Sequence, residues 1–376
     1  MSIYDEVLDF INAPEQTRFD ALALKVFRHQ FDTVVPYRQY CLSLDVSPAG
    51  VRSPDEAPAL STVAFKYAEL TDMVTPAQPE HERVFMTSGT TAGRDERGCH
   101  RVPRSDIYRA SALGHLRKTL FPDGARMRML SLHPTAERMP ESSLGQMISW
   151  AIEEFGSGDA LCAADRRAVE IAPALEFLRA AQRRVEPVCM MATTAALGAL
   201  FDELRARHLR LGLARGSRLM DTGGPKGQSV PLRPGQVVER ARDLLGLDAA
   251  LVINEYGMTE MCSQLYDATS FNFPDVRRAE SRGARRADSS EERRKLGPAW
   301  LGVAAVDPSS LKRVPDGSPG LLRFFDLANV GSVSAILTGD LGVVRDGTVT
   351  VLGRAEDGEA RGCALGIEQF FAARDS

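Results

Sequence analysis

The sequence predicts an α/β fold in which helices cover a largely parallel sheet, followed by a small β-rich region at the carboxyl end. From about residue 84 to residue 270, short apolar runs alternate with amphipathic helical segments, the pattern of a layered α/β protein. After Leu296 the apolar runs are separated by turn sequences instead of helices. The chain has 376 residues, of which 44% are hydrophobic, so it can bury a large core, and its length favours two or three units.

Composition and charge exclude several classes of protein. The 46 basic and 50 acidic residues give a net charge of −4, which provides no global positive field for nucleic acid or an anionic membrane. No basic residue precedes Arg18, which argues against a secretory signal. The sequence also has no run of about 18 apolar residues that would suggest an integral membrane segment. We therefore expect a cytoplasmic enzyme that does not bind nucleic acid.

Residues 1–80 predict a helical lead-in packed on the core. Apolar Phe19, Leu22 and Val26 recur at helical spacing between residues 16 and 31, and Pro36 is expected to close that helical segment. Prolines and a polar stretch at residues 75–80 then separate this region from the rest of the chain.

Residues 81–296 predict the α/β core. The expected helices include Leu175 and Leu178 in one segment and residues 197–204 in another. Residues 275–295 mix basic and acidic side chains with almost no apolar ones, which favours a solvated, mobile loop over a basic patch. The expected strands lie at residues 127–132, 187–191, 217–220 and 250–253.

Residues 297–376 predict a small β-rich subdomain. Its strands are expected in the apolar runs AWLGVAAV, GLLRFF, VSAIL and TVTVL. The turns between them are expected at Pro-Asp-Gly, Thr-Gly-Asp and Arg-Asp-Gly, since these residues favour tight reversals of the chain.

A run of hydroxyl and glycine residues at 87–93, Thr-Ser-Gly-Thr-Thr-Ala-Gly, directly follows apolar residues 84–86. Glycines allow successive backbone N–H groups to turn toward one anion, and hydroxyls add further donors, so the run predicts a phosphate-binding loop. A polar hairpin turn has the same composition and remains an alternative at this point. The sequence contains no G-x-x-x-x-G-K-[ST] motif and no convincing G-x-G-x-x-G after a strand, which argues against a P-loop kinase and a dinucleotide-binding protein.

A second motif, Asn-Glu-Tyr-Gly-Met-Thr-Glu at 254–260, follows the strand expected at 250–253. Ligands of α/β sheets bind where the strands end. In such a place an aromatic ring can stack on adenine, a threonine can bind phosphate and a carboxylate can hold Mg²⁺. The alternative is a turn that ends a strand and contains an incidental acid.

Together with Thr-Gly-Asp at 338–340 and Gly-Arg at 353–354, these two motifs resemble the adenylate-forming superfamily. Within that superfamily the chain is most similar to the acyl-protein synthetase (LuxE) family. The similarity extends over nearly the whole chain, through VPYRQYC at 35–41, AFK at 64–66, DTGGPKG at 221–227, KLGPAWL at 295–301, FFDLAN at 324–329 and EARGC at 359–363.

The resemblance implies an adenylate-forming fold and a site for ATP and Mg²⁺. It implies that Thr259 faces the α-phosphate, that Glu260 holds Mg²⁺, and that Asp340 and Arg354 anchor the ribose. The triphosphate loop would comprise Thr87, Ser88, Gly89, Thr90, Thr91 and Gly93. The adenine-binding residues would comprise Gly223, Gly224, Pro225, Glu255, Tyr256 and Gly257.

The chain departs from the superfamily pattern in this loop. Ala92 stands at the usual glycine, and Gly93-Arg94-Asp95 replaces the usual Gly-x-Pro-Lys. Arg94 or Arg97 is therefore a candidate for the cation that neutralises phosphate charge.

The end of the chain bears on the reaction. Only 22 residues follow Arg354 and none is lysine. Acyl-CoA synthetases of this superfamily have a mobile cap with a catalytic lysine after the corresponding Gly-Arg motif, and we expect this chain to lack it. The resemblance implies that Cys363 accepts the acyl group as a thioester, with Arg361 lowering the pKa of its thiol. The partners it implies are a carboxylic acid substrate, expected to be a fatty acid, and an acyl-accepting protein such as a reductase.

No C-x-x-C pair among the cysteines suggests a metal. Most of the other cysteines, at 41, 99, 162, 189 and 262, are expected to be small apolar core residues. Polar residues that can line an acyl pocket include His100, His133, Ser142 and Ser143, and the sequence does not rank them. Two other functions stay open. One is an acyl- or aryl-CoA ligase without the usual cap, and the other is a catalytically silent nucleotide-binding scaffold.

Overall fold

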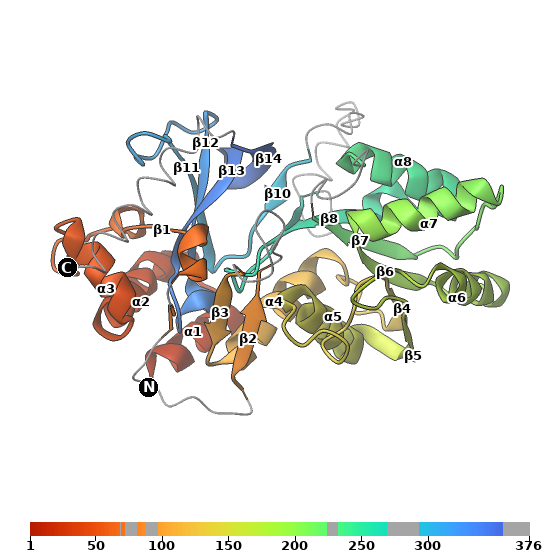
Figure 1. The fold of residues 1–376 in the computed structure, drawn as a ribbon, viewed down its shortest axis with the longest axis horizontal. Coiled ribbons are helices and arrows are strands. Elements are labelled where there is room, and N and C mark those ends of the chain that lie inside the picture. Colours follow the sequence, from red (N-terminus) through yellow and green to blue (C-terminus); the bar gives the residue numbers. More distant parts are fainter. Residues whose placement is uncertain (68, 72–80, 88–96, 224–231, 269–292, 356–376) are drawn as a thin grey trace. The chain divides into compact units, whose positions relative to one another are not determined.

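The computed structural model describes residues 1–67, 69–71, 81–87, 97–223, 232–268 and 293–355 (Figure 1). The chain forms two compact units, each built from separate stretches of sequence. Unit 1 comprises Met1–Gly114, Met258–Gln264 and Leu296–Ser376, and unit 2 comprises His115–Gly257 and Leu265–Lys295. The division of the sequence into 1–80, 81–296 and 297–376 stays a prediction.

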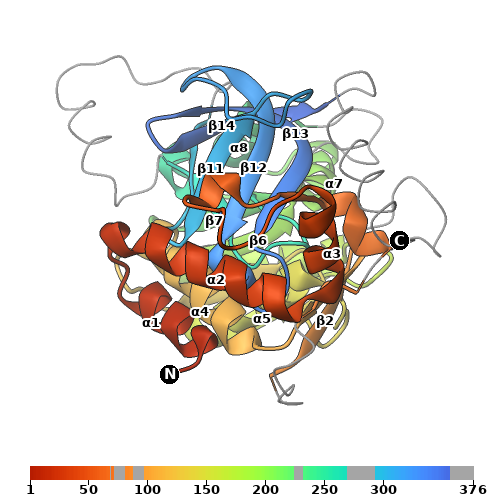
Figure 2. The ribbon, with the colours of Figure 1, turned by 90° about the vertical axis from the view of Figure 1, so that its left-hand side faces the viewer.

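Unit 1 begins with three helices, α1 (Ile3–Asn12), α2 (Phe19–Thr33) and α3 (Val35–Ser43), of which α2 contacts both others (Figure 2). The Ser2 hydroxyl and the Asp5 carboxylate cap α1 reciprocally. The helix predicted between residues 16 and 31 is confirmed as α2. That helix ends at Thr33, before Pro36, as expected. Pro36 lies in the first turn of α3, where a missing N–H costs nothing, so a second helix begins there.

The sheet of unit 1 is antiparallel, in the order β11 (Leu301–Val306), β12 (Pro319–Asp326), β13 (Ala335–Arg345) and β14 (Thr348–Arg354), and β1 (Leu60–Ser61) joins β13 in parallel. Each of the four β-rich runs predicted from the sequence overlaps one of the strands β11 to β14. Helix α2 packs on this sheet, with the Phe19 ring 6.4 Å from that of Phe325. The Gln30 side chain also donates to Ser334 Oγ at 3.0 Å.

Two of the three predicted turns of the β-rich region are confirmed. Asp346 and Gly347, between β13 and β14, have φ of 50° and 73°, as a tight hairpin with two left-handed residues requires. The predicted turn at Thr-Gly-Asp is wrong, because residues 338–340 lie inside β13. The pairing register of β13 with β14 shifts directly after them, between Leu341 and Gly342.

Unit 1 also contains a separate hairpin, β2 (Arg83–Met86) with β3 (Cys99–Val102), which are antiparallel. The predicted phosphate loop connects these two strands, and its residues 88–96 lie outside the described residues. The described residues also contain short 3₁₀ segments, at η1 (Gln16–Arg18), η2 (Pro54–Glu56), η3 (Thr62–Lys66), η5 (Ala249–Leu251) and η6 (Leu327–Asn329).

Unit 2 has a largely parallel sheet, as predicted. Its strand order is β9 (Leu265–Asp267), β8 (Val252–Tyr256), β7 (Arg218–Thr222), β6 (Val188–Thr193), β4 (Met127–Ser131) and β5 (Gly156–Cys162). All neighbours in this order are parallel except β9 with β8. The four strands predicted from apolar runs correspond to β4, β6, β7 and β8. The short strand β10 (Lys295–Leu296) begins at the last residue of unit 2.

Three helices of unit 2, α6 (Ile171–Arg184), α7 (Thr194–Ala206) and α8 (Pro234–Leu245), bury apolar side chains in one core with the strands. Leu178 and Leu200, in the two predicted helices, are fully buried in this core. Truncation of such a leucine to alanine typically costs about 2–5 kcal/mol. Helix α5 (Ser143–Phe155) also belongs to unit 2, and α4 (Ser105–Thr119) begins in unit 1 and ends in unit 2. None of the described helices combines the length and apolar character that crossing a membrane demands.

Candidate functional site

Nine of the residues proposed from the sequence as site residues are described by the structure. They are Thr87, Thr259, Glu260, Asp340 and Arg354 in unit 1, and Gly223, Glu255, Tyr256 and Gly257 in unit 2. Ser88, Gly89, Thr90, Thr91, Gly93, Gly224, Pro225 and Cys363 lie outside the described residues.

In unit 2, the described members of the predicted adenine-binding set lie where neighbouring parallel strands end. Thr222, the last residue of β7, is in register with Glu255, and Tyr256 ends β8. Gly223 follows β7 with φ of 93°, a left-handed conformation that other residues seldom adopt. The structure therefore places Gly223 and Glu255 at one edge of the sheet, the edge where ligands of α/β sheets bind.

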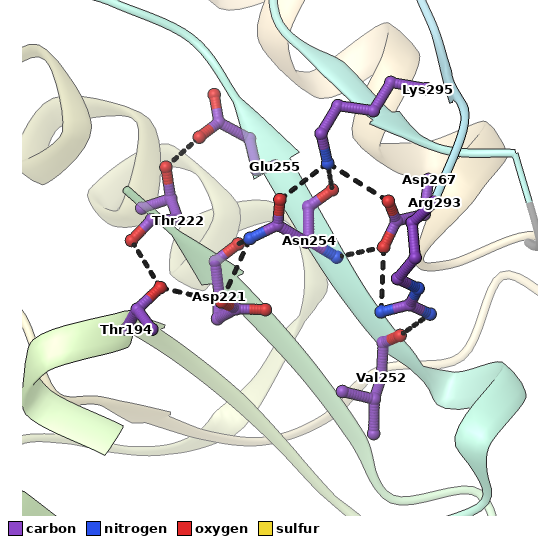
Figure 3. Close-up of polar contacts among 9 residues, drawn as sticks. All are labelled: Thr194, Asp221, Thr222, Val252, Asn254, Glu255, Asp267, Arg293 and Lys295. Carbon is purple, nitrogen blue, oxygen red and sulfur yellow. Dashed lines mark hydrogen bonds and ion pairs between the residues drawn. The ribbon is translucent and has the colours of Figure 1, made fainter. Parts of the chain in front are cut away.

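A buried polar network that was not predicted from the sequence joins the side chains next to this edge of the sheet (Figure 3). The Thr194 hydroxyl donates to Asp221 Oδ2 at 2.9 Å and to the Gly223 carbonyl at 3.0 Å. Asn254 Nδ2 donates to the same Asp221 oxygen at 3.0 Å. Thr194 on α7 thus binds the backbone at Gly223, where the predicted adenine turn begins, and Asp221 on β7 and Asn254 on β8 extend this network.

The network also includes two cations, Arg293 and Lys295, at the carboxyl end of the charged residues 275–295. Lys295 Nζ contacts Asn254 Oδ1 at 2.6 Å and Asp267 Oδ1 at 3.1 Å, and the Arg293 guanidinium contacts Asp267 Oδ2 at 3.0 Å. Lys295 and Asp267 are 5% and 0% exposed. The prediction of a solvated loop over 275–295 is therefore wrong at its carboxyl end, because burial of Asp267 and Asn254 requires a cation there.

Burial raises the pKa values of two acids of this network. It raises the pKa of Asp221 to about 6 and that of Glu255 to about 7, against the effect of the hydrogen bonds from Thr194 to Asp221 and from Thr222 to Glu255. Asp221 Oδ1 is buried without a hydrogen-bond partner among the described residues. Near neutral pH, Glu255 is therefore close to its own titration point.

A pH dependence of stability follows from Glu255. Its pKa is about 7 in the folded chain against an ordinary 4.5, so the native state binds a proton that the unfolded state releases. The contribution of Glu255 to the free energy of unfolding is fully present below about pH 4.5 and is lost as the pH rises through 7. We expect Glu255→Gln, which cannot ionise, to gain on the order of 2 kcal/mol relative to wild type between pH 5 and pH 8.

Urea unfolding of both proteins at pH 5, 6, 7 and 8 measures this difference. The matched control is Glu176→Gln, at an exposed glutamate on α6, which should leave the pH slope of wild type unchanged. Identical slopes for wild type and Glu255→Gln would show that Glu255 ionises as it does in water.

In unit 1, the backbone of the Thr259–Glu260 pair is held by side chains from two other elements. His100 Nδ1, on β3, lies 2.7 Å from the Thr259 carbonyl oxygen, and Asn329 Nδ2, in η6, donates to the Glu260 carbonyl at 2.7 Å. Burial lowers the pKa of His100 to about 4, so its ring is neutral at physiological pH. The side chains of Thr259 and Glu260 themselves are partly exposed.

The residues that follow Glu260 are held by Asp326. Its carboxylate accepts from the Cys262 backbone N–H at 2.9 Å and from the Ser263 hydroxyl at 2.6 Å. Burial raises the pKa of Asp326 to about 6. The segment FFDLAN, noted in the sequence only for its family likeness, thus supplies both Asp326 and Asn329 to this part of unit 1.

Asp340 and Arg354, the predicted ribose residues, are brought together by sheet register. They are Cα partners between β13 and β14, and Arg354 Nε lies 3.1 Å from Asp340 Oδ1. The Arg354 side chain is 64% exposed and that of Asp340 is 17% exposed. The pair leaves polar atoms facing solvent at the end of β14.

Thr87 stands at the base of the predicted phosphate loop. Its backbone N–H donates to the Gly98 carbonyl at 2.8 Å, and its hydroxyl accepts from the Gly98 N–H at 2.7 Å. The Arg97 guanidinium donates to the carbonyls of Thr87 and Met86, at 2.6 and 3.2 Å. Arg97, one of two candidates for a phosphate-neutralising cation, therefore binds the loop base, and Arg94 lies outside the described residues.

The other polar residues named from the sequence have local structural partners. His133 Nε2 lies 3.0 Å from Ser142 Oγ, and Ser142 caps α5 by accepting from the Gly145 N–H. The residues that sequence reasoning missed are Thr194, Asp221, Asn254, Asp267, Lys295, Asp326 and Asn329. A polar residue inside or next to an otherwise buried strand was the available signal, since such a residue needs a partner.

Comparison with known proteins adds an independent finding. The family model described as "Acyl-protein synthetase, LuxE" matches residues 6–372 of the chain. The long-chain-fatty-acid--luciferin-component ligase of Aliivibrio fischeri is 22% identical over 382 residues, which cover 96% of this chain and 92% of that protein. The enzyme of the same name from Vibrio harveyi is 33% identical over 85 residues, a match that spans 21% of this chain and 22% of that protein.

Among solved structures, an open conformation of 2-hydroxyisobutyryl-CoA ligase, in complex with 2-HIB-AMP and CoA, is similar in fold. The TM-score is 0.62 at 17% sequence identity, and the match covers 90% of this chain and 70% of that one. At this identity the likeness concerns the fold, and it agrees with the adenylate-forming architecture expected from the motifs.

Proposed function

The chain belongs to the acyl-protein synthetase (LuxE) family, and from this premise we propose that it uses ATP to activate a carboxylic acid as an acyl-adenylate. The acyl group then passes to the thiol of Cys363 and on to a partner protein such as an acyl reductase. The observation that supports this proposal most is the family match over residues 6–372. By analogy with the ligase from Aliivibrio fischeri, the substrate is a long-chain fatty acid.

In the first step, an oxygen of the substrate carboxylate attacks the α-phosphorus of ATP and pyrophosphate leaves. The protein contributes position and charge stabilisation, because the bonds that form and break belong to the substrates. Gly223 and Tyr256 contact adenine, with Glu255 and Gly257 beside them. Thr259 donates to the α-phosphate.

Further residues act on the phosphates and the ribose in this proposal. The loop that begins at Thr87 binds the triphosphate through its backbone N–H groups. Asp340 accepts from the ribose hydroxyls, and Arg354 orients the Asp340 carboxylate through the 3.1 Å contact between them. The partial exposure of both side chains is compatible with binding of a small molecule.

Magnesium suits the donor set of the described residues. Those residues contain no group of three or more His, Cys, Asp or Glu side chains that could enclose a metal. Mg²⁺ commonly binds one or two carboxylates and takes its other ligands from phosphate and water. Glu260, with its backbone held by Asn329 and its side chain partly exposed, is the residue that would hold it. When bound, the ion neutralises phosphate charge as pyrophosphate leaves.

In the second step, the Cys363 thiolate attacks the carbonyl carbon of the acyl-adenylate. A thioester forms, the bond to the phosphate oxygen breaks and AMP leaves. The thiolate is the reactive form of cysteine, and an adjacent cation such as Arg361 favours it. Transfer to the partner protein then releases the thiol for another cycle.

One experiment tests the proposal as a whole. The full chain is incubated with ATP, Mg²⁺ and a panel of fatty and aromatic acids, and its intact mass is measured before and after hydroxylamine. We expect a mass increase equal to one acyl group that hydroxylamine removes. Release of the acyl group to added coenzyme A, without a protein-bound intermediate, would favour the CoA-ligase alternative.

Acid-dependent exchange of labelled pyrophosphate into ATP measures the first step separately. A chain that exchanges pyrophosphate with none of the acids, although it binds ATP, would be a silent nucleotide-binding scaffold. Exchange without an acyl-protein would retain the adenylation step and refute the transfer to Cys363.

A further inference from the structure

A small cavity in unit 1 is lined by His100 and Asn329, the two residues whose side chains hold Thr259 and Glu260. It has about 10 Å³ of space for the centre of a water molecule, and its lining includes Tyr4, His100, Cys262, Asn329 and Gly331. This volume is about the minimum that one ordered water needs. The cavity walls come from α1, β3, η6 and the segment that follows Glu260.

Two buried polar atoms on residues that line this cavity have no hydrogen-bond partner among the described residues, His100 Nε2 and Asn329 Oδ1. The two residues are 1% and 2% exposed. Leaving a buried polar atom unpaired costs about 1–3 kcal/mol. Two such atoms, on residues that line one water-sized cavity, point to a bound group that satisfies both.

The chemistry of both atoms follows from their other contacts. A carbonyl oxygen can only accept, so His100 donates to Thr259 through Nδ1–H, and Nε2 of the neutral ring is an acceptor. Asn329 uses Nδ2 to donate to the carbonyls of Glu260 and Val333, at 2.7 and 3.1 Å, so Oδ1 is also an acceptor. Two acceptors cannot bond each other, and the group between them must provide two donor hydrogens.

We propose that one buried water donates to both His100 Nε2 and Asn329 Oδ1, and that these side chains act together as positioning residues for Thr259 and Glu260. The water joins His100 Nε2 to Asn329 Oδ1, and the other nitrogen or amide group of each side chain donates to one of two successive backbone carbonyls. This arrangement fixes the direction in which the Thr259 hydroxyl and the Glu260 carboxylate leave the backbone. The water site rests on geometry alone, and its role in catalysis rests on the proposed function.

The water and the tautomer are measured without any assay of activity. In ¹⁵N spectra of the full chain, His100 should be the Nδ1–H tautomer. A high-resolution crystal structure of the full chain should show one water within hydrogen-bond distance of both acceptors. An Nε2–H tautomer, or a cavity without water in which the two side chains have moved into direct contact, would overturn the proposal.

The positioning role is tested with variants assayed by pyrophosphate exchange. His100→Leu removes the donor to Thr259, and Asn329→Leu removes the donor to Glu260. Loss of a side chain that orients a metal ligand typically costs 10–100-fold in metal affinity or activity. We expect each variant to need at least about 10-fold more Mg²⁺ for half-maximal exchange, with a smaller change in the KM for the acid.

His100→Asn is the conservative variant, because its amide nitrogen stands close to the position of Nδ1 and keeps the donor to Thr259. It should recover most of the Mg²⁺ affinity that His100→Leu loses. The matched control is His115→Leu, at a buried histidine on α4 that is 4% exposed and has no role in the site; its Mg²⁺ requirement should equal that of wild type.

Folding of each variant is checked by circular dichroism and thermal unfolding. A folded His100→Leu protein with an unchanged Mg²⁺ requirement would overturn the positioning role. If the wild type exchanges no pyrophosphate with any acid, the proposed function fails, whereas the tautomer and the water are still decided by spectroscopy and crystallography.

Discussion

Cys363→Ser is expected to abolish the hydroxylamine-labile acyl group on the protein, while pyrophosphate exchange continues near the wild-type rate. A thiolate is a strong nucleophile at neutral pH, whereas a serine hydroxyl without a neighbouring base is a weak one. Exchange depends only on formation of the acyl-adenylate and its reversal, so the loss should be confined to the second step. Intact mass before and after hydroxylamine measures the label, and exchange of labelled pyrophosphate measures the first step.

The described cysteines provide controls and support this choice of nucleophile. Burial raises the pKa of the Cys41 and Cys189 thiols to about 12, and raises that of Cys262 well above its ordinary value, so these thiols are poor nucleophiles. Cys99 and Cys162 are partly exposed, and Cys99→Ser and Cys162→Ser should both keep the acyl label. Retention of the label in Cys363→Ser, or its loss in either control, would assign the thioester to another residue.

Lys295→Met is expected to lower the free energy of unfolding of unit 2 by about 3–5 kcal/mol, the usual cost of removing one partner from a buried ion pair. Lys295 Nζ contacts Asn254 Oδ1 and Asp267 Oδ1, and the Asp267 carboxylate is fully buried. Without the lysine, Arg293 is the remaining cation in contact with Asp267 in Figure 3, and Asn254 Oδ1 loses its charged donor. The same change should weaken nucleotide binding, because Asn254 also donates to Asp221 below the predicted adenine turn.

Urea denaturation followed by far-ultraviolet circular dichroism measures this loss. The control is Lys25→Met, the same substitution at a lysine whose side chain is 60% exposed and lies 2.6 Å from Glu6. An exposed ion pair contributes at most about 1 kcal/mol, so the control should be nearly as stable as wild type. Addition of Asp267→Asn to Lys295→Met should restore part of the loss, because the buried negative charge then disappears. Equal stabilities of the two lysine variants would mean that Lys295 is not needed to balance the buried acids.

Local patterns in the sequence were sufficient to predict most of the described helices and strands. Apolar runs such as residues 127–132 and 187–191 are strands because a fully buried parallel strand has no polar face, and the spacing of Leu197, Leu200 and Leu204 matches one face of a helix. Thr-Gly-Asp at 338–340 was misjudged because glycine is compatible with several backbone conformations, and the strand around it selects among them.

The sequence by itself determined the alternation of helices and strands, the family, and the identity of the candidate residues, because each depends on residue order along the chain. The tertiary structure alone decided which residues hold the candidate site residues in place. Lys295 follows Asn254 by 41 positions, and Asn329 follows Glu260 by 69. Such pairs meet only after strands and loops have packed, and the energy that joins them arises from burial, which a linear pattern does not contain. Burial is also the reason that Arg293 and Lys295, which were expected in a solvated loop, are the counterions of the buried Asp267 carboxylate.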